Sequence, residues 1–177
     1  MHQQLIIEKI STILAATEHD YDSQLTGLVD EANGIFLAGA GRSALVCKNF
    51  AMRLMHAGYT VNLVGETVTP SIKEGDLLIV ISGSGETQQL AAFTQKAKDV
   101  GAKAILISSK SESTIGSMVD AVFNIGRPDM YEKVHGMPMG SVFELSTLIF
   151  LEAVVSYIIH EKNLTEEGMR AIHANME

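Results

Sequence analysis

Residues 77–90 read LLIVISGSGETQQL and carry the strongest indication of the fold class. It begins with an unbroken apolar run rich in Ile and Val, continues into a loop of small residues, and leads directly into a segment with helical spacing. An apolar run without polar alternation is typical of a strand that is buried on both faces of a parallel sheet. Residues 77–81 are therefore predicted to form an inner strand, followed by a helix over 87–100.

The same alternation of short apolar runs and helical segments recurs along the chain. It predicts a three-layer α/β/α sandwich of the flavodoxin-like class, with a five-stranded parallel sheet. The expected strands cover residues 34–38, 61–64, 77–81, 104–107 and 121–125. Crossover helices are expected over 43–57, 87–100 and 114–119, and further helices over 5–17, 21–32 and 141–160, with a short polar helix after them.

The length of 177 residues is typical of one domain, so we expect a single domain over 1–177. Helices in 1–33 and 139–177 are expected to flank a sheet core at 34–125. Glu144 and Glu152 interrupt the most apolar segment, which therefore suits a buried helix better than a membrane span. Because that segment is apolar around most of its circumference, we also expect a partner subunit to cover it.

Charge and cysteine content limit the possible setting of the protein. The formal net charge is −8, and no block of Lys or Arg is present, which argues against a nucleic-acid partner. The single cysteine, Cys47, cannot form an internal disulfide and is interpreted as a core thiol. The N-terminal segment lacks the pattern of a signal peptide. We therefore expect a cytoplasmic protein with no membrane partner.

The loop SGSGET, residues 82–87, has the features of a phosphate site. It lies at the carboxyl end of a predicted parallel strand and at the start of a helix, where free N–H groups attract anions. Glycine allows the main chain to approach a ligand closely. The loop lacks the Lys of the P-loop that binds nucleoside triphosphates, so a phosphate monoester is a better candidate ligand than a nucleoside triphosphate. The alternative is an ordinary turn in which Ser84 caps the helix.

A second loop of the same kind, GAGRS at residues 39–43, follows the first predicted strand. Ala44 stands where a dinucleotide-binding motif would have its third glycine, so dinucleotide binding is only weakly indicated. Arg42 at a helix start is opposed by the helix dipole by roughly 0.3–1 kcal/mol unless a negative group lies nearby. That group could be a bound anion or a carboxylate of the protein.

The two loops together resemble those of the sugar isomerase (SIS) family, whose domains bind phosphosugars. The longer stretch 38–87, which contains GETVTP, and the segment PMGSVFE at 138–144 are similar to the 6-phospho-3-hexuloisomerases within that family. This resemblance covers nearly the whole chain. It implies the SIS fold and the conversion of D-arabino-3-hexulose 6-phosphate to D-fructose 6-phosphate through a cis-enediol, in the ribulose monophosphate route of formaldehyde fixation.

The resemblance also implies a set of site residues, a homotetramer with sites composed from two chains, and a reaction that needs no cofactor. No metal is expected either, because the spacing of the histidines is not that of metal ligands. It implies Glu144 as the catalytic base and His56 as an auxiliary acid or base. The phosphate-binding residues would be Ser43, Ser82, Ser84 and Thr87. The other substrate-binding residues would be Gly41, Arg42, Gly83 and Gly85.

Plainer interpretations of the same residues stay open. Glu144 follows Ser141 by three, the spacing of a helix capping box. His56 lies near the end of a predicted helix, where a structural histidine is favoured as much as a catalytic one. The other histidines show no metal-ligand spacing. The side chains interpreted as packing residues are Leu45, Met52, Leu54 and Met55.

Two other functions remain possible from the sequence. One is another SIS phosphosugar isomerase, of the arabinose 5-phosphate or sedoheptulose 7-phosphate type. The other is a non-catalytic module that binds a sugar phosphate, although the segment before Gly34 is too short and acidic for a convincing DNA-binding module.

Overall fold

The computed structural model describes residues 2–132 and 135–176, and its centre is a parallel sheet of five strands. The strands are β1 (Ile35–Gly39), β2 (Val61–Leu63), β3 (Leu77–Ile81), β4 (Lys103–Ser108) and β5 (Ala121–Asn124). Their order in the sheet is β2-β1-β3-β4-β5, and every neighbouring pair is parallel. The predicted fold class and all five strands are confirmed.

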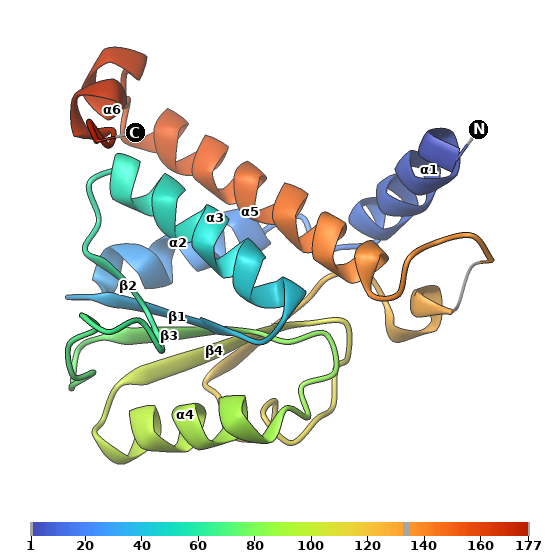
Figure 1. Ribbon diagram of the computed structural model, residues 1–177, viewed down its shortest axis with the longest axis horizontal. Helices are drawn as coiled ribbons and strands as arrows, with labels where there is room; N and C mark the ends of the chain where they lie inside the picture. Colours follow the sequence, from blue (N-terminus) through green and yellow to red (C-terminus); the bar gives the residue numbers. More distant parts are fainter. Residues whose placement is uncertain (1, 133–134, 177) are drawn as a thin grey trace.

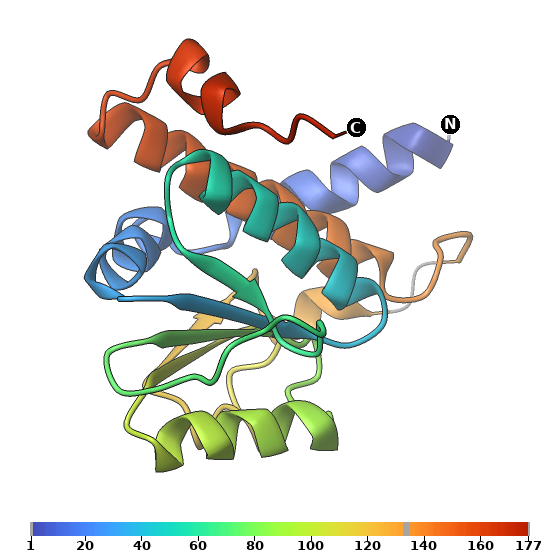
Figure 2. The ribbon, with the colours of Figure 1, turned by 60° about the vertical axis from the view of Figure 1, so that its left-hand side comes forward.

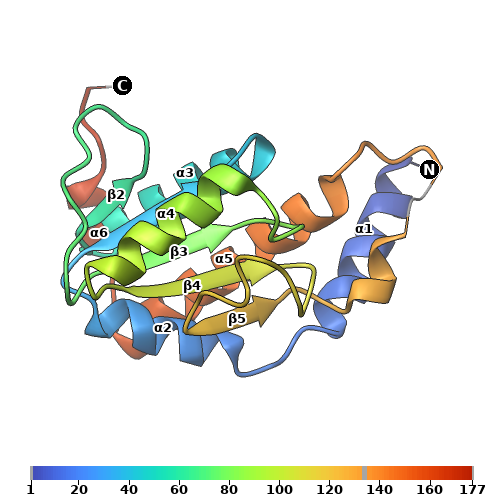
Figure 3. The same cartoon turned by 90° about the horizontal axis from the view of Figure 1, so that it is seen from below.

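Helices cover both faces of the sheet (Figure 1). The helix α4 (Gln88–Asp99) lies on one face, as Figure 3 shows from below. The opposite face carries α2 (Tyr21–Glu31), α3 (Arg42–His56) and α5 (Ser141–Glu161) (Figure 2). The remaining helices are α1 (His2–Ala15), a 3-10 turn at Pro128–Tyr131 and α6 (Glu166–Ile172).

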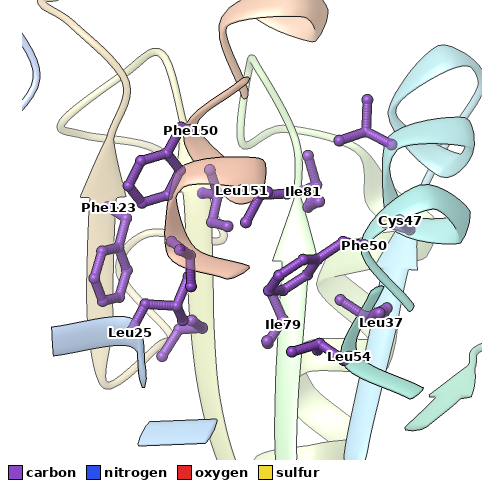
Figure 4. Close-up of a cluster of buried hydrophobic side chains, with 14 of the residues drawn as sticks. Leu25, Leu37, Cys47, Phe50, Leu54, Ile79, Ile81, Phe123, Phe150 and Leu151 are labelled. Carbon is purple, nitrogen blue, oxygen red and sulfur yellow. The ribbon is translucent and has the colours of Figure 1, made fainter. Parts of the chain in front are cut away.

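Alternation of side chains along the inner strands divides the core into two clusters. On β3, Ile79 and Ile81 point toward α3 and α5, whereas Leu78 and Val80 point toward α4. Figure 4 shows the first cluster, in which Phe50 of α3 packs against the β3 side chains. Both faces of β3 are fully buried, which is why its sequence shows no polar alternation.

The prediction of a helix over 114–119 is wrong, because this segment forms a series of turns. The N–H of Ile115 donates to the carbonyl of Gly85 at 3.0 Å, and the N–H of Gly116 donates to the hydroxyl of Ser113 at 3.0 Å. These bonds to a neighbouring loop and to a local side chain replace the regular backbone ladder of a helix.

Candidate active site

The candidate active site lies where the chain leaves β1 and β3. These strands are neighbours, and Gly39 at the end of β1 is in register with Ile81 at the end of β3. From this point α3 carries the chain to β2 on one side, and α4 carries it to β4 on the other. Ligands of open parallel sheets bind at such a switch point, outside the carboxyl ends of the strands. The loops at 40–41 and 82–87 therefore flank the site.

Three helices begin at this edge of the sheet without a side-chain cap. The residues that precede α3, α4 and α5 are Gly41, Thr87 and Gly140, and within the described residues none of them makes a capping hydrogen bond through its side chain. The first N–H groups of a helix have no partner within the helix and attract negative charge. Ser84 does not cap α4, which corrects the plain interpretation of this loop.

The hydroxyl groups of loop 82–87 lie beside its own N–H groups. Ser82 Oγ accepts a hydrogen bond from the N–H of Gly85 at 3.2 Å. Ser84 Oγ accepts one from the N–H of Glu86 at 3.2 Å. Ser82 is buried, whereas Ser84 is exposed and Thr87 is half-buried. Two N–H groups of the loop are thus bonded to its own hydroxyls, and Ser84 lies on its exposed side.

Glycine is required at two positions of these loops. Gly41 has a φ of 56°, in the left-handed region that favours glycine, and it turns the chain from β1 into α3. A Cβ atom on Gly83 would lie 3.0 Å from the ring of Phe143. The start of α5 therefore packs directly against loop 82–87. The sequence contained no indication of the contact between Phe143 and Gly83.

Glu144 forms a two-pronged ion pair with Arg42. The Arg42 Nη2 donates to Glu144 Oε1 at 2.9 Å, and Arg42 Nε donates to Glu144 Oε2. The Glu144 side chain is only 13% exposed, whereas that of Arg42 is 65% exposed. The pair raises the pKa of Arg42, mainly through the hydrogen bond and then through the charge of Glu144. It joins α5 to α3 at the starts of both helices.

The capping box, which was the plain alternative for Ser141 and Glu144, is absent from this helix start. Ser141 is the first residue of α5, and its hydroxyl donates to the carbonyl of Pro138 at 2.8 Å. The residue before it, Gly140, has a left-handed conformation. Because the helix starts one residue earlier than a Ser141 cap requires, Glu144 is not the third residue after the cap, and it binds Arg42 instead. This pairing is the carboxylate alternative that the sequence left open for Arg42.

His56 does not join the other site residues within one chain. It is the last residue of α3, which has 15 residues and begins at Arg42 beside the site. A helix of this length places His56 about 21 Å from Arg42, toward the opposite edge of the sheet. There the His56 ring stacks on that of His173, with centroids 4.9 Å apart. Both rings line a groove of about 560 Å³ between α3, α5 and α6.

Two of the residues interpreted as packing side chains are exposed. Leu45 is 61% exposed, and Met52 is 51% exposed where it lines the same groove as His56, although Leu54 is fully buried as expected. The helix α5 is better covered than expected, because α1, α2 and α3 all pack against it. Its length and composition would allow it to cross a membrane, but its apolar side forms part of the core. Two large apolar side chains are thus exposed on α3.

Cys47 is a core thiol, as predicted. It is buried on α3, and a Cβ atom on Gly39 would lie 2.9 Å from its Sγ. Burial raises the pKa of the thiol to about 12. Cys47 is therefore uncharged at neutral pH and is not a nucleophile. Across residues 2–132 and 135–176, no group of three or more His, Cys, Asp or Glu side chains is arranged to hold a metal ion.

Known proteins resemble this chain over nearly its whole length. Residues 28–155, which include every candidate site residue, match the SIS domain family. The chain is 53% identical, over 99% of its length, to a protein of Methylomonas aminofaciens named 3-hexulose-6-phosphate isomerase, 98% of which is covered. A protein of the same name from Bacillus subtilis is 38% identical, with 97% of this chain and 95% of the relative covered.

A solved structure extends the likeness to three dimensions. It is that of a Methanococcus jannaschii protein whose crystal structure infers a molecular function of 3-hexulose-6-phosphate isomerase. The TM-score is 0.88 at 32% sequence identity, with 99% of this chain and 98% of that chain covered. The likeness therefore includes the helices before and after the sheet as well as the sheet itself.

Proposed function

This chain belongs to the SIS domain family, and from that premise we propose that it converts D-arabino-3-hexulose 6-phosphate to D-fructose 6-phosphate. The observation that carries the proposal is the 53% identity, over 99% of the chain, to a 3-hexulose-6-phosphate isomerase. The reaction moves a carbonyl group from C3 to C2 and belongs to the ribulose monophosphate route of formaldehyde fixation. It changes no overall oxidation state, so it needs no redox cofactor.

The phosphate group binds at the edge where α3 and α4 begin. Its ligands are the hydroxyls of Ser43, Ser82, Ser84 and Thr87, together with main-chain N–H groups of the two loops. The uncapped starts of α3 and α4 support this placement, because they add unsatisfied donors and a partial positive charge. Gly41, Gly83 and Gly85 let the main chain approach the substrate closely.

Glu144 acts as the base. Its carboxylate takes the proton from C2 of the substrate, a cis-enediolate forms, and a proton returns to C3. The substrate is open-chain, because its O6 is phosphorylated and no other hydroxyl can close an unstrained ring on C3. The contact of Phe143 with Gly83 supports the assignment, since it brings the start of α5 against the phosphate loop.

Arg42 holds the carboxylate of Glu144 before the substrate arrives. The guanidinium has donors to spare and is mostly exposed, so it can also reach a substrate oxygen. A positive charge placed there would stabilise the negative charge that develops on the enediolate. Arg42 therefore has two roles, which are to orient the base and to bind the substrate.

His56 reaches the site of a second copy of the chain. On α3 the residues Leu45, Asn49, Met52 and His56 follow one another at helical spacing and form an outward stripe. Asn49 is the midpoint of the helix. If two copies of α3 pair antiparallel about Asn49, then His56 of the partner subunit lies beside Arg42. The exposed apolar side chains of Leu45 and Met52 would be buried in this contact.

We place such pairs in a homotetramer in the cytoplasm. Apolar side chains as large as Leu45 and Met52 seldom stay exposed together on one helix of a monomer. The lone thiol, Cys47, is buried and reduced, which fits a reducing compartment.

The decisive experiment supplies the purified chain with 3-hexulose 6-phosphate, which is generated in situ from ribulose 5-phosphate and formaldehyde. Formation of fructose 6-phosphate at a rate above the enzyme-free control is the expected result. Parallel assays contain arabinose 5-phosphate or sedoheptulose 7-phosphate. Turnover of either of these in place of the hexulose would assign the chain to another SIS isomerase. Binding without turnover of any of the three would make it a sugar-phosphate-binding module.

A further inference from the structure

Glu86 poses an electrostatic problem in a loop that binds phosphate. It lies between Ser84 and Thr87, two of the proposed phosphate ligands, and it carries a negative charge of its own. A carboxylate near a phosphate weakens the binding of that phosphate through like-charge repulsion. A small neutral residue would avoid this cost, so the carboxylate must serve another purpose or face away from the phosphate.

The Glu86 side chain binds the turn that follows β4. Its Oε1 accepts a hydrogen bond from the N–H of Thr114 at 3.0 Å, and its Oε2 accepts one from the Thr114 hydroxyl at 2.5 Å. Both oxygens are thus engaged by one residue that lies 28 positions away in the chain. We call this contact the Glu86–Thr114 clamp.

The protonation state of Glu86 agrees with the clamp. The hydrogen bond from the Thr114 hydroxyl, and then that from its N–H, lower the pKa of Glu86. The charge of Lys110 on the same turn acts in the same direction. The carboxylate is therefore ionised at neutral pH and bonds Thr114 with its charged form, which makes the hydrogen bonds stronger than those between neutral groups.

Further contacts join the same two segments around the clamp. The N–H of Ile115 donates to the carbonyl of Gly85 at 3.0 Å. A Cβ atom on Gly85 would lie 2.1 Å from the hydroxyl of Ser113, so the two main chains are in close contact here. Gly85 also has a φ of 66°, a conformation that needs support from its surroundings. The clamp lies directly after this residue and before Thr87.

We propose that Glu86 is a positioning residue, which holds the main chain of Ser84–Thr87 in its phosphate-binding conformation through Thr114. The clamp also directs the carboxylate toward the turn after β4. This inference rests on the proposed phosphate-binding role of loop 82–87. It assigns a function to two residues, Glu86 and Thr114, that touch neither the reacting carbons nor the phosphate.

The test compares two substitutions that each remove one negative charge but are expected to change the phosphate affinity in opposite directions. Glu86→Gln removes a negative charge and weakens the clamp, because an amide offers only one acceptor oxygen. Glu112→Gln removes an equal charge from the same turn, two residues before Thr114, and leaves the clamp intact. Repulsion alone predicts that both variants bind phosphate more tightly. The clamp predicts that Glu86→Gln binds it about 3- to 10-fold more weakly, whereas Glu112→Gln binds it equally well or better.

Affinity is measured by calorimetry with inorganic phosphate and with fructose 6-phosphate, neither of which requires turnover. Thr114→Val is expected to weaken binding as Glu86→Gln does, and Thr114→Ser is expected to retain it because the hydroxyl is kept. In all four variants kcat should stay within about twofold of the unmodified chain, so the effect appears in KM. Circular dichroism and melting curves show whether each variant is folded.

Two outcomes overturn the proposal. One is a folded Glu86→Gln variant that binds phosphate as tightly as Glu112→Gln. The other is a double variant, Glu86→Gln with Thr114→Val, whose loss equals the sum of the two single losses, because residues that act through one contact are not additive. Absence of isomerase turnover in the unmodified chain would refute the proposed reaction, while the phosphate titrations would still report on the clamp.

Discussion

Replacing Glu144 by Gln separates catalysis from structure at one side chain. The structure gives this residue a possible purely structural role, because it joins α5 to α3 through Arg42. A glutamine can keep one of the two hydrogen bonds to the guanidinium but cannot accept a proton at neutral pH. Arg42 is 65% exposed, so water can replace the bond that is lost. We therefore expect a melting temperature close to that of the unmodified chain.

The expected loss of turnover is much larger. Positioned acid-base catalysis contributes roughly 10²- to 10⁴-fold, so Glu144→Gln should lower kcat by about 10²-fold or more. The affinity for fructose 6-phosphate should change little, because the phosphate ligands lie on the other two loops. The assay is exchange of the C3 proton of fructose 6-phosphate with deuterated solvent, which reports formation of the enediol directly. This exchange should fall in parallel with kcat.

A matched control is Arg42→Gln, which removes the other partner of the same ion pair and retains the carboxylate group of Glu144. If the ion pair were the whole contribution of Glu144, then both variants would lose exchange to the same extent. The expected result is that Arg42→Gln raises KM and retains measurable exchange, whereas Glu144→Gln does not. Near-normal exchange in a folded Glu144→Gln protein would refute the reasoning and direct attention to His56 of the partner subunit.

Three further predictions concern the phosphate loop, the proposed subunit contact and the thiol. Ser84→Ala should raise KM by roughly 10- to 100-fold, because it removes a hydrogen bond to a charged phosphate, and such a bond contributes about 1.5–3 kcal/mol. An unchanged KM would show that Ser84 does not bind the substrate. Met52→Glu should shift the mass measured by light scattering toward the 19.1 kDa of one chain and should lower the activity. The α3 pairing would be contradicted if the unmodified protein were already a fully active monomer. Cys47 should resist thiol reagents at pH 8, since its raised pKa of about 12 keeps the thiol protonated at that pH. The thiol should react only after denaturation. Rapid modification of the native protein would show that the core around α3 opens.

Local sequence patterns were enough to predict the fold class and to indicate loop 82–87 as a candidate phosphate site. Both follow from local patterns, because a strand that is buried on both faces must be apolar throughout, as Leu77–Ile81 is. A loop of small residues between such a strand and a helix lies at the carboxyl edge of the sheet in any parallel arrangement. The buried state of Cys47 also followed from its place on an amphipathic helix.

Where the sequence failed, a competing contact from a distant segment was responsible. The segment 114–119 has helix-like spacing of its apolar residues, but Glu86 binds Thr114 and Gly85 binds Ile115. The stretch from Ser141 to Glu144 has the spacing of a capping box, but Arg42 offers the carboxylate a charged partner with two donors. In both places a local preference of roughly 1 kcal/mol was overridden by bonds that the local sequence does not contain.

Which side chains meet at the candidate site depends on the packing of the whole chain. Arg42 and Glu144 are 102 residues apart, and they form a pair because α3 and α5 both begin at the same edge of the sheet. The same arrangement places Phe143 on Gly83 and sends His56 to the far end of α3. Helical and strand periodicity describe what each segment buries, but the partner of a polar side chain depends on the order of strands in the sheet. That order, β2-β1-β3-β4-β5, is a property of the whole chain.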